Sequence, residues 1–198
     1  MGIEIELKYR ATRSQQQAVL RACGGVPHTI SMETTYYDTA DRRLTARKMT
    51  LRRRLENGVS VCTLKTPGQG DARGEWDCLC PTIEEAIPEL CKLSGREDLQ
   101  DLPAAGVVPV CGARFTRQAV EIRTSDFTAE LALDDGVLLG GGREMPLCEV
   151  ELELKSGNPE AMTLYMQLLA AVHDLQPEKK SKFRRAMELA EGESYGEF

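Results

Sequence analysis

Apolar and charged residues alternate strictly along residues 2–9, whose sequence reads GIEIELKY. In an extended strand successive side chains point to opposite faces, so Glu4, Glu6 and Lys8 share one face. Two carboxylates about 7 Å apart on such a strand can hold a hard divalent cation. The ammonium of Lys8 lies beyond them and can meet an anion on that metal. The same alternation is also typical of an ordinary strand with one face in water.

Further runs of this alternation, bounded by turn residues, predict a sheet-rich chain. With the first, the predicted strands cover residues 2–10, 32–38, 50–56, 59–66, 75–80, 110–123, 127–134 and 147–155. Helical spacing and capping residues predict helices over residues 14–22, 83–93, 159–174 and 177–190. Pro88 interrupts the second helix, and residues 94–109 are expected to be irregular. Because hairpins such as Asn57-Gly58 join the strands, we expect a mostly antiparallel sheet.

Like charges stack on one face of several predicted strands. These sets are Arg52 with Arg54, Glu130 with Asp134, and Glu149 with Glu151 and Glu153. A solvated surface normally mixes signs, because neighbouring like charges repel. The helices also need apolar surface to cover, which the opposite faces of a curled sheet would supply. Two interpretations remain: the charged faces form an exterior in water, or they point inward around a polar tunnel in a closed antiparallel barrel.

The composition limits the functions that the chain can have. It has 198 residues, of which 41% are hydrophobic and 28% charged, as in a soluble globular domain. We expect one domain over residues 1–190 and a tail over residues 191–198. The net charge of −6 argues against a nucleic acid as the partner. No apolar run is long enough to span a membrane and no signal peptide is recognised, so we expect a cytoplasmic protein without a membrane partner, as a monomer or homodimer.

The seven cysteines do not indicate a zinc site. No pair has the spacing CxxC, and the chain contains only two histidines, His28 and His173. Zinc sites use paired thiolates or clusters of cysteine and histidine. We therefore expect reduced thiols that are mostly buried as small apolar groups.

Eight motifs, in order along the chain, resemble those of one family. They are Glu4-Ile5-Glu6-Leu7-Lys8, Tyr36-Tyr37-Asp38-Thr39, Leu51-Arg52-Arg53-Arg54, Thr63-Leu64-Lys65, Arg73-Gly74-Glu75-Trp76 with Arg117, Leu131-Ala132-Leu133-Asp134, Cys148-Glu149-Val150-Glu151-Leu152-Glu153 and Ser181-Lys182-Phe183-Arg184-Arg185. The first has the form ExExK. Together they resemble the CYTH domains, or triphosphate tunnel metalloenzymes, and cover essentially the whole chain. The resemblance is greatest to the CYTH portion of bacterial inorganic triphosphatases that carry an additional CHAD domain.

The resemblance implies an α+β fold: a closed eight-stranded antiparallel β-barrel, or tunnel fold, with helices packed on the outside. It implies one or two Mg²⁺ or Mn²⁺ ions in the tunnel, with candidate ligands at Glu4, Glu6, Asp134, Glu149, Glu151 and Glu153. Mg²⁺ keeps several waters, so not all six can contact the metal. The candidates for binding phosphate oxygens are Lys8, Arg52, Arg54, Lys65, Arg73, Arg117, Lys182 and Arg185. Glu4, Glu6, Lys8 and Lys65 are the candidate catalytic residues.

The reaction implied is metal-dependent hydrolysis of inorganic triphosphate, a small-molecule substrate, to pyrophosphate and phosphate. Phosphoryl transfer depends mainly on charge neutralisation and positioning, so we expect neither a covalent intermediate nor a histidine base. Alternatives within the family are a thiamine or nucleoside triphosphatase and a class IV-like adenylyl cyclase. The cyclases resemble one another in a His-Phe pair ahead of ExExK, where this chain has only Met1-Gly2-Ile3. A non-catalytic polyphosphate-binding module is the alternative from another class.

Overall fold

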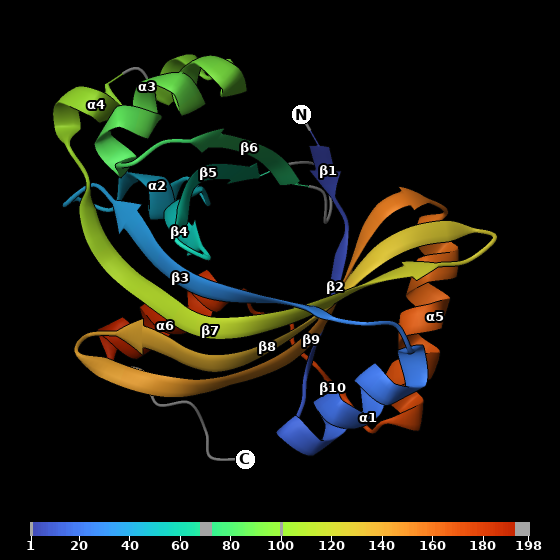
Figure 1. Ribbon diagram of the computed structural model, residues 1–198. Helices are drawn as coiled ribbons and strands as arrows, with labels where there is room; N and C mark the ends of the chain where they lie inside the picture. The colour runs from blue at the N-terminus through green and yellow to red at the C-terminus, as the bar shows by residue number, and fades with distance from the viewer. Residues whose placement is uncertain (1, 68–72, 100, 193–198) are drawn as a thin grey trace.

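The protein consists of one antiparallel sheet with helices on both of its faces (Figure 1). This computed structural model describes residues 2–67, 73–99 and 101–192, except the side chains of residues 2–4, 73, 97 and 103. Within those ranges ten strands pair in the order β1-β6-β5-β4-β3-β7-β8-β9-β2-β10. The strands are β1 Gly2–Glu4, β2 Glu6–Arg10, β3 His28–Asp38, β4 Thr50–Glu56, β5 Val59–Pro67, β6 Arg73–Leu79, β7 Val108–Arg123, β8 Phe127–Gly140, β9 Arg143–Gly157 and β10 Gln176–Pro177.

The helices are distributed along the whole described chain. They are α1 Arg13–Cys23, α2 Arg43–Ala46, α3 Ile83–Ser94, the 3-10 helix η1 Glu97–Leu99, α4 Leu102–Ala105, α5 Pro159–Val172 and α6 Lys182–Glu191. Helix α3 passes through Pro88 without a break. The segment expected to be irregular contains η1 and α4. At the C-terminal end of the described chain, Gln176–Pro177 pairs with β2, so α6 begins later than predicted, after its N-cap Ser181. The predicted tail over residues 191–198 lies mostly outside the described residues.

The prediction of a closed eight-stranded barrel is wrong in strand number and in closure. The curved row of strands begins at β1 and ends at β10. One N-terminal segment supplies the first strand of the row and the last but one, because β1 pairs with β6 whereas β2 pairs with β9. The segment changes partner at Ile5, whose carbonyl accepts a hydrogen bond from the Leu154 N–H at 2.9 Å. The far edge of β2 is then taken by β10, so the ladder does not close on itself.

Apolar residues on the convex face of the sheet form two cores, as the strand alternation predicted. Helices α1 and α5 cover one core through Val19, Met162 and Met166, which pack against Leu131 and Leu152. The second core lies over β4, β5 and β6, where Leu51, Leu64, Ile83, Ile87 and Leu90 are all buried. Figure 1 shows α3 and α4 above β5 and β6, and α1 and α5 at the other end of the molecule.

Helix α6 departs from the prediction that all helices pack outside the sheet. Its residues Phe183, Ala186 and Met187 pack against Phe115 and Leu138, on the concave face (Figure 1). The physical reason is that the side chains on this face of β7 and β8 change from charged to apolar along the strand. On β8 the side of the strand that carries Asp134 continues to Leu138, and on β7 the side of Arg117 carries Phe115. The helix covers the apolar half of the inner face and leaves the charged half open.

The hairpins follow their sequence signals. Asn57 and Gly58 have φ angles of 50° and 86°, the positive values that a tight two-residue hairpin requires. Strands β8 and β9 are longer than predicted and meet at Gly141 and Gly142, with φ angles of 57° and 73°. This long hairpin extends the sheet under α6. Among the helices formed by the described residues, none has the length and apolar character needed to cross a membrane.

A substitution at Gly140 tests the packing of α6 inside the sheet. A Cβ atom at Gly140 would lie 2.3 Å from the Ala186 carbonyl oxygen and 2.7 Å from the Ala190 nitrogen. Gly140→Ala should therefore lower the free energy of unfolding by about 1–3 kcal/mol, the usual cost of overpacking. Chemical denaturation measures the change, and Leu164→Ala on the exposed side of α5 is the control. Equal stabilities of the Gly140 variant and the wild type would contradict this packing.

Candidate active site

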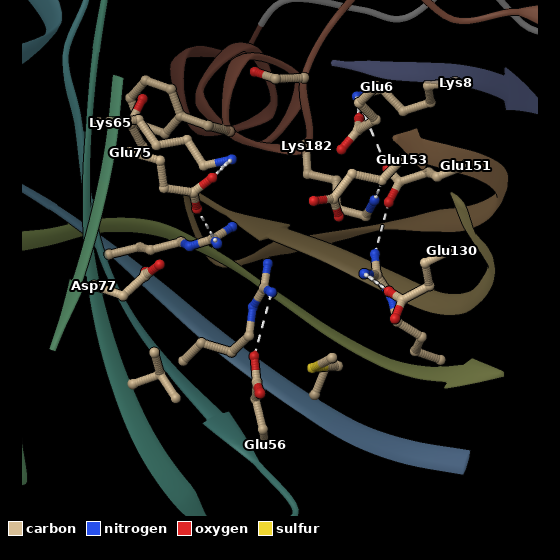
Figure 2. Close-up of a pocket in the computed structure, with 18 of the residues that line it drawn as sticks. Glu6, Lys8, Glu56, Lys65, Glu75, Asp77, Glu130, Glu151, Glu153 and Lys182 are labelled. Atoms are coloured by element: carbon tan, nitrogen blue, oxygen red, sulfur yellow. Dashed lines mark hydrogen bonds and ion pairs between the residues drawn. The ribbon is translucent and has the colours of Figure 1, made fainter. Parts of the chain in front are cut away.

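A cavity of about 440 Å³ occupies the charged half of the concave face. Strands β2 to β9 contribute side chains to its walls, and the first residues of α6 close one side. Figure 2 shows Lys65, Glu75 and Asp77 on one wall, facing Glu6, Glu153 and Lys182 on the other. The charged faces of the strands therefore point inward. Of the two interpretations of the sequence, the inward-facing one is confirmed.

The basic wall comes from β4 and β5. Arg52 and Arg54 lie two residues apart on β4, so their side chains share one face. Lys65 on β5 stands opposite Thr50 on β4. Glu75 on β6 holds this wall in place, with its carboxylate 3.3 Å from Arg52 Nη2 and 3.4 Å from Lys65 Nζ. Glu75 therefore braces basic side chains, as expected for an acid on the wall opposite the other carboxylates.

Arg54 is the most deeply buried cation of this wall. Its Nε donates to Thr34 Oγ1 at 3.2 Å, and its Nη1 lies 3.5 Å from Glu56 Oε1. Burial, reinforced by repulsion from Arg52, lowers the pKa of the Arg54 guanidinium to about 10. A buried cation whose charged form is disfavoured gains the most from a bound anion. This position is well suited to a phosphate group.

The acidic wall is a row of carboxylates across three neighbouring strands. Glu6 on β2 stands directly opposite Glu153 on β9, which stands directly opposite Glu130 on β8. Their side chains are 26%, 31% and 30% exposed, so each reaches the cavity. Lys8 Nζ lies 3.1 Å from Glu6 Oε1, and Lys155 Nζ lies 2.8 Å from Glu153 Oε1. Oxygen atoms in such a row are accessible to a hydrated cation.

A second set of acids lies deeper, at the base of α6. We call Asp134, Glu149 and Glu151 the buried trio; each is at most 5% exposed. Lys182 Nζ lies between their carboxylates, 2.9 Å from Asp134, 2.7 Å from Glu149 and 2.5 Å from Glu151. Burial would lower the pKa of this ammonium, but the three acids raise it well above its ordinary value. Lys182 is therefore a firmly charged cation inside the protein.

Two arginines complete the neutralisation of the buried trio. Arg117 holds Asp134 with two hydrogen bonds of 2.8 Å and donates to Glu151 at 2.6 Å. Arg185 on α6 pairs with Glu149. Although burial favours the neutral form of Glu151, Lys182 and Arg117 hold its pKa well below its ordinary value. Lys182, Arg117 and Arg185 thus pair with the three carboxylates of the trio, whereas burial raises the pKa of Glu149.

Helix α1 contributes a residue to the site from the convex side of the sheet. The side-chain nitrogen Nε2 of Gln16 donates to the backbone carbonyl of Asp134 at 2.9 Å and to that of Glu149 at 2.8 Å. These two residues are direct partners on β8 and β9. Gln16 itself is 7% exposed. It therefore fixes the backbone from which two members of the buried trio project.

The predicted site residues occupy three different environments. Glu6, Lys8, Arg52, Arg54, Lys65, Arg117, Glu151, Glu153 and Lys182 line the cavity. Asp134, Glu149 and Arg185 are buried beneath it. The side chains of Glu4 and Arg73 lie outside the described part of the chain, where only their backbone pairing with each other on β1 and β6 is known.

Sequence reasoning did not assign Glu130 or Gln16 to the site. The sequence does indicate Glu130, because this residue shares a strand face with Asp134, but the sequence analysis assigned no role to it. Gln16 has no signal in the sequence, because its partners are backbone carbonyls far along the chain. Arg114, which is out of phase with Arg117, points away from the cavity and pairs with Glu144 at 3.2 Å.

The two acidic sets differ in how they suit a divalent metal. Oxygens of the buried trio lie within 4.8 Å of one another, a spacing that can hold an ion. In this structure Lys182 Nζ contacts all three of these carboxylates. Glu6 and Glu153 offer hard oxygen ligands that reach the cavity, and these fit Mg²⁺ or Mn²⁺.

Comparison with known proteins agrees with this geometry. The inorganic triphosphatase of Haemophilus influenzae is 32% identical over 155 residues, which are 76% of this chain and 44% of that protein. The thiamine-triphosphatase of Macaca fascicularis is 28% identical over 155 residues, which are 76% of this chain and 61% of that protein. The chain thus spans less than two thirds of either relative.

Solved structures share the fold. A Pyrococcus horikoshii protein superimposes with a TM-score of 0.66 and 20% identity, covering 94% of this chain and 99% of that one. A Hippeastrum protein, whose structure is described as that of an adenylyl cyclase candidate with a dominant triphosphatase activity, has a TM-score of 0.66 and 18% identity, covering 99% of this chain and 98% of that one. At these identities the likeness shows the fold alone.

A curved antiparallel sheet with a basic and an acidic wall around one cavity defines a class of proteins suited to binding a polyanion together with cations. The family profile of the CYTH domain matches residues 2–187, and the chain belongs to this family.

Substitution of Gln16 tests its role beneath the site. Gln16→Leu removes both hydrogen bonds and leaves the carbonyls of Asp134 and Glu149 without this partner. We expect the free energy of unfolding to fall by about 1–3 kcal/mol, the cost of unsatisfied buried polar groups. The matched control is Gln17→Leu, because Gln17 is exposed on the same helix. Equal losses in the two variants of α1, measured by chemical denaturation, would show that the bridge contributes nothing.

Proposed function

We propose that the protein hydrolyses inorganic triphosphate to pyrophosphate and phosphate, with one or two Mg²⁺ or Mn²⁺ ions. The observation that carries the proposal is the pairing of walls in one cavity: Arg52, Arg54 and Lys65 line the same cavity as Glu6 and Glu153, and Figure 2 shows Lys65 on the wall that faces these two acids. Membership of the CYTH domain family and the triphosphatases among the relatives support hydrolysis of a phosphoanhydride bond.

Each wall has its own part in this proposal. The guanidinium groups of Arg52 and Arg54 would bind phosphate oxygens through paired hydrogen bonds, and Lys65 would add a point charge. Glu75 would keep Arg52 and Lys65 oriented before the substrate arrives. Lys8, beside Glu6 on the acidic wall, would neutralise the end of the anion nearest the carboxylates.

The acidic wall would hold the metal. Glu6 and Glu153, with Glu4 as a further candidate on the same strand segment, would supply carboxylate oxygens. A bound divalent ion neutralises phosphate charge and lowers the pKa of a water molecule, which makes the water a better nucleophile. The cavity walls would position the anion so that its terminal phosphate faces this carboxylate row. No side chain needs to form a covalent bond to phosphate in this scheme.

A substrate comparison tests the reaction. We expect Mg²⁺- or Mn²⁺-dependent phosphate release from inorganic triphosphate, faster than from ATP or thiamine triphosphate, in a colorimetric phosphate assay. Absence of metal-dependent release from all three would contradict a hydrolase. Faster release from thiamine triphosphate or ATP would indicate the corresponding triphosphatase. Formation of cyclic AMP from ATP would indicate a cyclase, and triphosphate binding without turnover would indicate a polyphosphate-binding module.

Single substitutions should separate the two walls. Arg54→Ala should raise KM for triphosphate about 10- to 100-fold, because a charged hydrogen bond contributes roughly 1.5–3 kcal/mol. Glu6→Gln should instead lower kcat about 100-fold or more, because a metal ligand is lost. Steady-state kinetics at saturating metal distinguishes these effects. Arg114→Ala is the control, since Arg114 lies outside the cavity. Wild-type constants for either cavity variant would remove that residue from the site.

A further inference from the structure

Two cysteines lie side by side on the convex face of the sheet, away from the candidate active site. Cys62 on β5 and Cys78 on β6 are direct partners in the antiparallel ladder, and both are free thiols. Directly opposite residues of such a ladder point to the same face, with Cα atoms about 4.5–5.5 Å apart. Disulfides join cysteines whose Cα atoms are about 4.4–6.8 Å apart. The ladder therefore holds these two thiols at a spacing that one covalent bond can bridge with the strands in their present register.

The other five cysteines have no such arrangement. Cys111 and Cys148 stand opposite residues of other types on the neighbouring strands. Cys23 and Cys91 lie on helices α1 and α3. Cys80 comes just after β6, beyond the residue pairs that the structure describes for this strand and β5. Within the described chain, the cross-strand register thus selects one pair of cysteines.

The surroundings give the two thiols different parts in thiol exchange. Cys62 is fully buried in the second convex core, between Cys78 and its partner on β4, Arg53. Cys78 is only partly buried, so an oxidant in solution can reach its sulfur. Burial raises the pKa of both thiols, that of Cys62 to about 11, which makes exchange slow because the thiolate is the reacting form. Cys78 is therefore the thiol that meets the oxidant, and Cys62 is the thiol that completes a bond.

The same two strands carry part of the basic wall on their opposite face. Lys65 and Glu75 are direct partners there, with Lys65 Nζ 3.4 Å from the Glu75 carboxylate. Thr63 and Asp77 form the pair between them and the two cysteines, and Thr63 Oγ1 donates to Asp77 at 2.5 Å. A covalent bond between the cysteines would therefore fix the spacing of β5 and β6 directly behind this wall.

We propose that Cys62 and Cys78 form a redox modification site, at which a low-molecular-weight disulfide converts the two thiols into a cross-strand disulfide that joins β5 to β6. The Cys78 thiolate attacks one sulfur of the small disulfide, forms a mixed disulfide and releases one small thiolate. The Cys62 thiolate then attacks the Cys78 sulfur and releases the second small thiolate. The protein loses two protons and two electrons, and the small disulfide is reduced to two thiols. An excess of reduced thiol reverses both steps.

Incubation of the folded protein with mixtures of oxidised and reduced glutathione at pH 8 tests this site. With glutathione disulfide in excess, peptide mapping by mass spectrometry should show Cys62 joined to Cys78 in most chains. Cys78→Ser should form no disulfide to Cys62. The matched control is Cys148→Ser, which replaces a partly buried cysteine on β9 and should form the bond as wild type does.

Three mapping results would overturn the proposal. The first is Cys62 that remains a free thiol in the folded protein at the most oxidising glutathione ratio. The second is a wild-type bond from Cys62 to Cys80, which would mean that the strand register does not select the partner. The third is a bond that forms only after denaturant is added, because the folded sheet would then offer no such site.

Thermal unfolding measures the effect of the bond. The two cysteines enclose residues 63–77, and a disulfide across a loop of about 15 residues should raise Tm by roughly 5–10 °C. Reduction with dithiothreitol should restore the lower Tm. Amide hydrogen exchange should slow most in β5 and β6, about tenfold or more. Equal Tm and equal exchange in the oxidised and reduced forms would contradict a bond that joins the strands. None of these measurements involves turnover, so they stay distinct from failure of the proposed hydrolysis.

Discussion

Helix α6 covers part of the concave face of the sheet, so the charges buried beneath it must be neutralised inside the protein. Burying a carboxylate without a partner costs several kcal/mol, more than most single interactions supply. The chain meets this constraint deep under α6 with three acids and three bases. Nearer the opening of the cavity, acids and bases stand on separate walls, where water or a ligand can bind them and neutralise their charge. Depth therefore separates the charges that are paired within the protein from those that are open to the cavity.

Helix α6 determines which of these charges are buried. Its apolar residues take the half of the concave face that carries Phe115 and Leu138, and its first residue reaches the acids at the boundary. The cavity lies at the N-terminal end of the helix, where Lys182 and Phe183 line it. Gly140 permits this arrangement, because its missing side chain lets the backbone of α6 approach β8 closely. The position of the helix thus decides both the size of the cavity and which acids remain accessible.

The alternation of residues predicted the antiparallel pairing, the convex cores and most strands, but neither β10 nor the division of residues 2–10 into β1 and β2. It also placed Glu6 and Arg54 on charged faces, which now prove to line one cavity. It could not distinguish Glu149 from Glu153, because both lie on the same face of β9 and only the covering helix makes them different. The prediction that α6 packs outside the sheet was wrong because the amphipathic pattern of a helix does not indicate which face of the sheet it covers. The bridge from Gln16 depends on backbone atoms, which leave no pattern in side-chain types.

The pairing of β2 with β9 joins residues from nearly opposite ends of the chain. Contacts so distant in sequence close a large loop, and such contacts tend to form late in folding. The hairpins of β4 to β6 and of β7 to β9 are local and can form first. Glu6 and Glu153 would then meet only when the N-terminal segment docks. A cation that bound both carboxylates would stabilise this last step of assembly, so the order of assembly would itself prepare a place for the ion.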